Sequence, residues 1–178
     1  MRTNNTLKKL SLSSNKVGDE GVKALADALS TNHCLEVLYT GGNRISDEGA
    51  IAITAALRIN NTLKILSLQN NKVGDEGVQA LADALLSNNC LEGLYLGGNG
   101  ISDEGAIAIA TALRTNNTLM ELFLACNNIG DEGAISITDA LSTNGSLKHL
   151  DLQNNFRISE QTRNDIASTI RADITFVQ

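Results

Sequence analysis

The chain has 178 residues, of which 42% are hydrophobic, and a formal net charge of −6. Its length and apolar content suffice for one folded domain with a substantial core, and its negative charge argues against nucleic acid, which is bound by basic surfaces. Only 3% of the residues are aromatic, and proline and tryptophan are absent, so the composition indicates one small apolar motif repeated many times.

Signals for export or membrane insertion are absent from the sequence. The first ten residues, MRTNNTLKKL, contain no apolar run, and the stretch Gly49–Leu57 falls far short of the roughly 20 residues that cross a bilayer. Cys34, Cys90 and Cys126 are odd in number, and Cys34 and Cys90 stand two repeats apart, too far for a disulfide, so we expect free thiols. These features predict a cytoplasmic protein that makes no contact with a membrane.

In chain order, the first predicted element is a strand over residues 7–12, LKKLSL. Its leucines alternate with polar residues, so one side faces a core and the other faces solvent. An α-helix is predicted next, because Val22, Leu25 and Leu29 in GVKALADAL share one helical face. Neither element can bury its apolar side alone, so the pattern requires a stack of such units.

This strand-and-helix unit recurs six times with a period of 28 residues. Each unit starts with a leucine and follows L-x-x-L-x-L-x-x-N-x-[IV]-[GS]-D-E-G, except that the second unit has Thr40 in place of the third leucine and the sixth unit departs from the second half of the pattern. We number places from that first leucine. We expect one domain over residues 1–178 with the units 7–34, 35–62, 63–90, 91–118, 119–146 and 147–178.

The pattern resembles the ribonuclease-inhibitor-like leucine-rich repeats, similar to those of NOD-like receptors and the Ran GTPase-activating protein, over essentially the whole chain. The resemblance implies an α/β fold, a right-handed solenoid shaped as a horseshoe arc, with parallel strands on the concave face and helices on the convex face. It also implies that the asparagine at place 9 forms a ladder of hydrogen bonds to the turns. A short amide that donates and accepts hydrogen bonds suits that role. These asparagines are Asn15, Asn43, Asn71, Asn99, Asn127 and Asn155.

The Asp-Glu-Gly element offers pairs of carboxylates that suggest acid–base chemistry or a metal site. A catalytic pair is needed once, whereas this element occurs in five units, so we interpret it as structural. Serine or aspartate caps the free N–H groups at a helix start, and acids there suit the helix dipole. The pairs are Asp19/Glu20, Asp47/Glu48, Asp75/Glu76, Asp103/Glu104 and Asp131/Glu132.

No catalytic constellation is visible in the sequence. The glycine pairs 41–42 and 97–98 lack the lysine of a P-loop and the G-x-G-x-x-G of a dinucleotide fold, so we expect them to ease turns. His33 and His149 share no metal-ligand spacing with a cysteine or with each other. We therefore expect no catalytic residue, metal or cofactor, and not an enzyme.

The two ends of the chain differ. Residues Arg2–Leu7 match Arg114–Leu119, so the first strand is expected to have an open edge, and we expect either a fragment of a longer protein or self-association through that edge. The last unit gains a residue after Asn155 and turns polar, as a capping unit needs. Ile166 and Ile170 keep the inward helix places.

The aromatic residues point to a binding face. Tyr39, Tyr95 and Phe123 all occupy place 5 on the predicted concave face, and exposed aromatics are enriched in interfaces, although large β-formers also simply suit strands. Positive and negative side chains at places 2, 3 and 5 balance, which suits a protein or peptide partner. The predicted binding residues are Tyr39, Tyr95, Met120, Glu121, Phe123, His149 and Asp151.

Two alternatives stay open. One is a GTPase-activating regulator resembling the Ran GTPase-activating protein, which we rank lower because places 2, 3 and 5 hold no arginine. The other is a convex docking stripe of Ile51, Ile107 and Ile135, where two other units have Lys23 and Gln79. We expect these isoleucines to pack between neighbouring helices instead.

Overall fold

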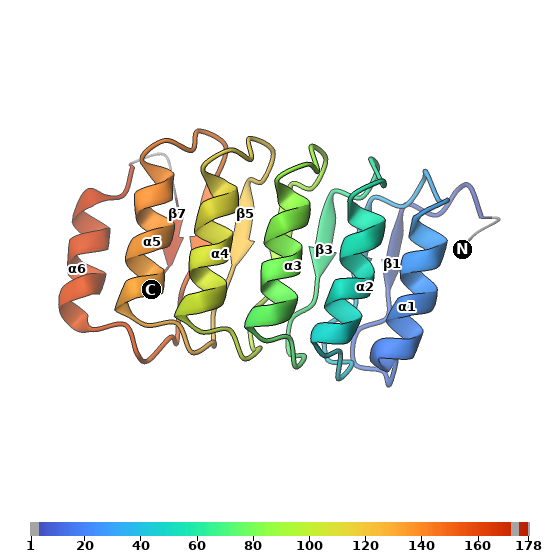
Figure 1. The fold of residues 1–178 in the computed structure, drawn as a ribbon, viewed down its shortest axis with the longest axis horizontal. Coiled ribbons are helices and arrows are strands. Elements are labelled where there is room, and N and C mark those ends of the chain that lie inside the picture. Colours follow the sequence, from blue (N-terminus) through green and yellow to red (C-terminus); the bar gives the residue numbers. More distant parts are fainter. Residues whose placement is uncertain (1–3, 172–174, 178) are drawn as a thin grey trace.

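The computed structural model describes residues 4–171 and 175–177, which form a parallel sheet with one layer of helices on a single side (Figure 1). The strands are β1 (Lys9–Ser11), β2 (Val37–Tyr39), β3 (Ile65–Ser67), β4 (Gly93–Tyr95), β5 (Glu121–Phe123), β6 (His149–Asp151) and β7 (Thr175–Val177). The helices are α1 (Gly18–Leu29), α2 (Asp47–Leu57), α3 (Asp75–Leu85), α4 (Asp103–Leu113), α5 (Asp131–Leu141) and α6 (Glu160–Thr169).

The sheet keeps the strands in the order of the sequence. Leu10, Leu38 and Leu66 are direct neighbours, and each later strand up to β6 continues the same register, so equivalent places of the units lie side by side. The predicted alternation of strand and helix in one parallel sheet is confirmed. A seventh strand, β7, which was not predicted, pairs with β6 and extends the sheet beyond the six.

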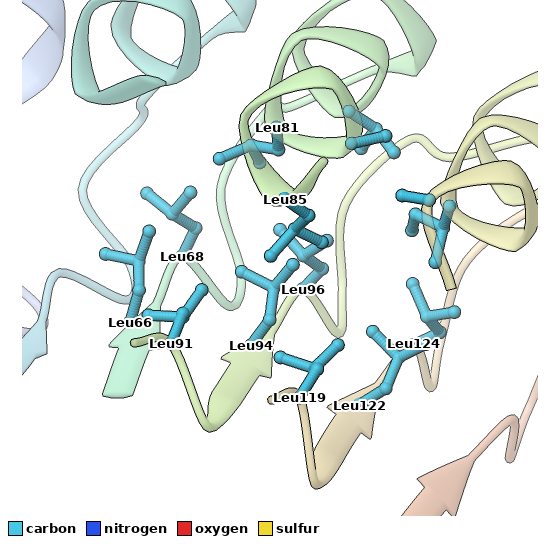
Figure 2. Packing of buried hydrophobic residues seen from close by; sticks show 14 of the residues in the cluster. Leu66, Leu68, Leu81, Leu85, Leu91, Leu94, Leu96, Leu119, Leu122 and Leu124 are labelled. Atoms are coloured by element: carbon cyan, nitrogen blue, oxygen red, sulfur yellow. The ribbon is translucent and has the colours of Figure 1, made fainter. Parts of the chain in front are cut away.

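The core lies between the two layers and consists mainly of leucine. Leu91, Leu94 and Leu96 of one unit point from the strand side toward Leu81 and Leu85 of α3, and all five are almost fully buried (Figure 2). Burying one such side chain contributes about 2 kcal/mol. Stacking the units therefore supplies the apolar contacts that no unit has alone.

The core is less complete at the N-terminal end. Leu7 is 37% exposed and Leu10 is only partly buried, whereas the equivalent Leu35 and Leu38 are buried. Within the described residues β1 pairs with β2 alone, so its outer edge is open, as predicted. At the other end Ile166 is buried and Ile170 packs against the core, as predicted for the last helix.

The predicted asparagine ladder is present in the turns after the strands. The Asn43 Oδ1 atom accepts the N–H groups of Asn15 and Val17 at 3.1 and 3.2 Å. Its Nδ2 atom donates to the carbonyl oxygens of Leu12 and Thr40, both at 2.9 Å. One side chain thus joins the backbones of two units. The same role is played by Asn71, Asn99, Asn127 and Asn155.

A second asparagine ladder, not predicted from the sequence, holds the loops between each helix and the next strand. Asn60 donates to the carbonyl oxygens of Leu29 and Asn32, and its Oδ1 atom accepts the N–H groups of Thr62 and Leu63. Equivalent bonds are made by Asn88, Asn116 and Asn144. The repeated Asn-X-Ser/Thr sequence in these loops reflects this ladder, because the asparagines that begin it are buried.

The aspartate of each Asp-Glu-Gly element binds the unit that follows. The Asp47 Oδ1 atom accepts the N–H groups of Gly74 and Gly77 at 2.7 and 2.9 Å, at the start of α3. The N-cap of α3 is Gly74, which has no side chain to cap the helix. Asp103 makes the same two bonds to the start of α5. The prediction that these acids serve helix starts is confirmed, because each pair lies in the first turn of its own helix, and the aspartate in addition bonds the start of the next helix.

Where the N-cap is a serine, that serine caps its own helix and the aspartate holds the serine. Ser46 Oγ accepts the N–H of Glu48, while Asp19 accepts both the N–H and the hydroxyl of Ser46 at 2.8 and 2.7 Å. Burial acts to raise the pKa of Asp19, but the bonds from Ser46 and Gly49 together bring it below the ordinary value. The carboxylate form therefore fits this position.

The glycine of the element makes room for that carboxylate. A Cβ atom at Gly77 would lie 2.7 Å from Asp47 Oδ1, and one at Gly105 would lie 2.6 Å from Asp75 Oδ1. Real Cβ atoms do not approach an oxygen so closely. Aspartate in one unit and glycine in the next are therefore required together, which explains why the motif recurs as a set.

The glycines at 42 and 98 ease the turns after their strands, as predicted. Their φ angles are +68° and +67°, in the left-handed region that glycine enters without steric cost. The equivalent Asn70 and Cys126 adopt the same region at +53° and +58°. Place 8 thus demands this conformation in every unit, whatever residue occupies it.

The convex isoleucines do not all pack between helices. Ile51 and Ile135 are 40% and 46% exposed, whereas Ile107 is half-buried, so the prediction is wrong for the first two. On α2 the inward places are taken by Ala50 and Ile53, which are fully buried. Because neighbouring residues of a helix point about 100° apart, Ile51 is turned outward.

Asn116 and Asn117 provide a test of the second ladder. Replacing the buried Asn116 by alanine should lower the free energy of unfolding by about 2–4 kcal/mol, because it leaves several buried backbone groups without partners. Replacing the exposed Asn117 should change it by less than about 0.5 kcal/mol. Chemical denaturation of both variants measures the difference, and equal losses would contradict the ladder's role.

Candidate functional site

The face of the sheet turned away from the helices carries the side chains of places 3 and 5 from β1 to β6, and we call it the concave face. Place 5 forms one row across the strands. Tyr39, Ser67, Tyr95, Phe123 and Asp151 are consecutive neighbours in it. The strand register therefore brings the two aromatic residues of β4 and β5 together and separates Tyr39 from them by one strand.

Tyr95 and Phe123 form an aromatic pair. Their ring centroids are 4.8 Å apart with planes at 73°, an edge-to-face arrangement that brings the positive edge of one ring to the negative face of the other. The Tyr95 hydroxyl donates a hydrogen bond to the Glu121 carboxylate. Tyr95, Glu121 and Phe123 thus form one connected group, which we call the aromatic patch.

Gly93 in β4 leaves room for the Tyr95 ring to lie across its own strand. A Cβ atom at Gly93 would come within 3.2 Å of Tyr95 Cε1 and 3.4 Å of its hydroxyl oxygen, so the ring lies over the strand at the point where a side chain is missing. This role was not predicted from the sequence. The signal was available, because the other units have Lys9, Val37 and Ile65 or another full side chain at place 3.

The aromatic patch perturbs the titration of its tyrosine. Burial of the ring is the largest cause, and the hydrogen bond to the Glu121 carboxylate adds to it, so the pKa of Tyr95 lies well above its ordinary value. The phenol therefore stays protonated and acts as a donor. The hydroxyl and the carboxylate hold each other in place on an otherwise apolar patch.

The side chains at place 5 point away from the core, but several of them are largely covered by their neighbours. Tyr39, Tyr95 and Phe123 are half-buried, and Ser67 is only 4% exposed, so neighbouring side chains cover much of a row that was predicted to face solvent. The small Ser67 side chain is flanked on both sides by tyrosines of the neighbouring strands. Tyr39 is covered by Lys9, whose Nζ atom lies 4.9 Å from the ring centroid in a cation–π contact.

Four of the charges that balance in the sequence form salt bridges in the structure. Lys8 and Glu36 lie 2.8 Å apart, and Lys64 and Glu92 lie 3.1 Å apart, across neighbouring strands. The hydrogen bond in the first pair raises the pKa of Lys8 and lowers that of Glu36. Exposed pairs of this kind add little stability, but they neutralise the charges at place 2 of the first four units.

The remaining predicted residues surround the aromatic patch. Met120, at place 2 of β5's unit, is 46% exposed and precedes Glu121 directly. His149 is exposed and is the neighbour of Glu121 in the next strand. Asp151 neighbours Phe123, and its Oδ1 atom accepts the N–H of Gln153 at 2.9 Å. Six of the seven predicted residues therefore lie together, with Tyr39 apart.

Metal-ligand clusters, disulfides and membrane-spanning helices are all absent from the described part of the chain. Across residues 4–171, no group of three or more His, Cys, Asp or Glu side chains is arranged to hold a metal ion. Cys34, Cys90 and Cys126 are free thiols, and burial raises the pKa of Cys90. None of the described helices is long and apolar enough to cross a membrane.

The sequence matches a family model described as "Leucine Rich repeat" at five places, which together cover well over half of the chain. The matched residues are 3–26, 31–53, 60–82, 87–110 and 115–137. The chain belongs to the leucine-rich-repeat family. Each match begins in the segment before a strand, spans that strand and ends within the helix that follows, in agreement with the repeat seen in the structure.

Solved structures share this leucine-rich-repeat fold. The structure of leiomodin-1 actin-binding site 2 has a TM-score of 0.68 and 24% identity over 79% of this chain and 82% of its own. The tropomodulin C-terminal domain of Caenorhabditis elegans has a TM-score of 0.68 and 16% identity over 93% and 92%. An octameric complex of latrophilin 3, Unc5D and the leucine-rich repeats of FLRT2 has a TM-score of 0.52 and 19% identity. The match covers 91% of this chain and 51% of the chain in that complex. No curated protein matches the sequence.

The pKa of Tyr95 can be measured directly because the chain has only two tyrosines. In a Tyr39→Phe background, Tyr95 should ionise well above the value of about 10 for a free phenol. Adding Glu121→Gln should lower its pKa, since the neighbouring carboxylate is removed, yet leave it raised by burial. Absorbance of tyrosinate during an alkaline titration measures both, and ionisation of Tyr95 at the free value would contradict the geometry.

Proposed function

We propose that this leucine-rich-repeat protein is a scaffold that binds a protein or peptide partner through the concave face, centred on the aromatic patch. The observation that carries the proposal is the edge-to-face pair of Tyr95 and Phe123 on the face that the helices leave uncovered. Aromatic side chains that pack on each other and stay partly open to solvent are typical of interface hot spots.

The arrangement of charge supports a protein partner. Salt bridges occupy Lys8, Glu36, Lys64 and Glu92, so much of the face offers neither a strong positive nor a strong negative surface. A polyanion would need unpaired cations to neutralise its phosphates. Met120, His149 and Asp151 place one thioether, one imidazole and one carboxylate around the patch, and polar groups around an apolar centre are typical of interface rims.

The similar structures point the same way. The leiomodin-1 structure is that of an actin-binding site, and the FLRT2 repeats are part of a complex with two other proteins. The shared fold makes a protein partner the first class to test for this chain, and the side chains of the concave face decide which protein it is.

The test is a double substitution on the patch. Tyr95→Ala with Phe123→Ala should weaken binding of a captured partner by about 2 kcal/mol or more, the range of a hot spot. Tyr39→Ala should weaken it less, because Ser67 separates Tyr39 from the patch. Partner affinity is measured by titration calorimetry, and thermal unfolding checks that the double variant stays folded.

Two outcomes would count against the proposal. Unchanged affinity with lost stability in the double variant would show that the aromatic pair is only structural. Stimulated GTP hydrolysis by a small GTPase, abolished by one concave substitution, would support the GTPase-activator alternative instead.

A further inference from the structure

A pocket of about 450 Å³ opens at the edge of the concave face, across the loops that join α2 to β3, α3 to β4 and α4 to β5. We call it the rim pocket. Its lining includes Arg58, Ile59, Cys90 and Met120. Asn60 and Asn88 of the second ladder also line it, and their bonds to the backbone hold this part of the wall in place.

The repeats themselves show that the apolar lining is not needed for the fold. Ile59 is 63% exposed, and the first, third, fourth and fifth units have threonine or serine at the same place. Met120 is 46% exposed where the other units have lysine or glutamate. Leu86, next to the lining residue Ser87, is 55% exposed where the others have serine or arginine. Three apolar side chains thus replace polar ones on one short stretch of rim.

The charge at the pocket favours a carboxylate beside the apolar group. Lys64 and Glu92 line the pocket and neutralise each other at 3.1 Å. Arg58 also lines it and is exposed, and within the described residues it forms no salt bridge. The pocket therefore carries a local positive charge on a chain whose net charge is −6.

The rim pocket is continuous with the aromatic patch. Met120 lines the pocket and is followed directly by Glu121 of the patch. Places 2 and 5 of one strand are about 10 Å apart at roughly 3.3 Å per residue. An extended segment of three or four residues can therefore reach from the pocket to Phe123.

We infer that the rim pocket receives a segment of the partner protein that carries a bulky apolar side chain with an acidic residue beside it. The apolar side chain contacts Ile59 and Met120, and the carboxylate pairs with Arg58. The exposed side chains of Asn61 and Asn89 at the pocket's edge supply hydrogen bonds for the segment's backbone. This inference rests on the proposed function and names the chemistry of the partner.

The probe is a phage-displayed library of random twelve-residue peptides, panned on the full chain, with the selected peptides synthesised and their affinities measured by fluorescence anisotropy. The selected peptides should share a bulky apolar residue within two positions of Asp or Glu. Ile59→Thr with Met120→Lys should weaken their binding about tenfold, and Arg58→Gln about threefold. Other units carry threonine and lysine at these two places, so the double variant should keep its thermal stability.

Matched controls come from the repeat. Arg114 stands at the place of Arg58 two units on and does not line the pocket, so Arg114→Gln should leave affinity unchanged within about twofold. Ile51→Gln with Ile135→Gln removes as many exposed apolar groups from the convex side and should also have no effect. A control that weakens binding as much as its test variant would overturn the inference.

The remaining outcomes separate the two proposals. Peptides that depend on Tyr95 and Phe123 but not on Ile59 and Met120 would overturn the rim site and leave the concave scaffold standing. Peptides that depend on Ile59 and Met120 alone would support the rim site and contradict the patch as centre of binding. Dependence on neither pair, or failure to select any peptide, would overturn the rim site.

Discussion

Hydrogen bonds from side chains of one unit to the backbone of its neighbour hold this structure in register. Each unit ends its strand and its helix in loops whose backbone groups have no partners of their own, and Asn43, Asn60 and Asp47 and their equivalents supply them. A buried backbone group left without a partner costs about 1–3 kcal/mol. The leucine core provides most of the driving force, but apolar contacts are not directional, so the polar ladders fix the 28-residue alignment.

Because these ladders hold the units together, the outward residues of the concave face can vary without disturbing the fold. The row at place 5 accepts serine, tyrosine, phenylalanine and aspartate on the same backbone, and the exposed rim at place 2 accepts lysine, glutamate and methionine. Each unit therefore serves as a control for the others. Met120 differs from its equivalents in the other units and stays exposed, so the fold does not depend on an apolar side chain at this place.

The period of the leucines predicted the strands, the helices and the buried set, since each of these follows from local spacing. The place of the aromatic patch followed from the same register. The reach of Asp47 to the next unit did not, because a strict repeat gives no sign of whether a side chain bonds within its unit or to a neighbour about 5 Å away. Two further features do not follow from the local spacing. The Tyr95 ring lies over Gly93, and the strand β7 pairs with β6 at a separation of 26 residues instead of 28.

Amide hydrogen exchange in the Asp47→Ala variant tests the ladder most directly. The N–H groups of Gly74 and Gly77 lie at a helix start, where amides normally lack helical partners and exchange quickly, but Asp47 holds both. Removing it should speed their exchange by about tenfold or more. Gly130 and Gly133, held by Asp103, should be unchanged. Equal exchange at Gly74 and Gly77 in both proteins, or equal acceleration at all four glycines, would contradict the account.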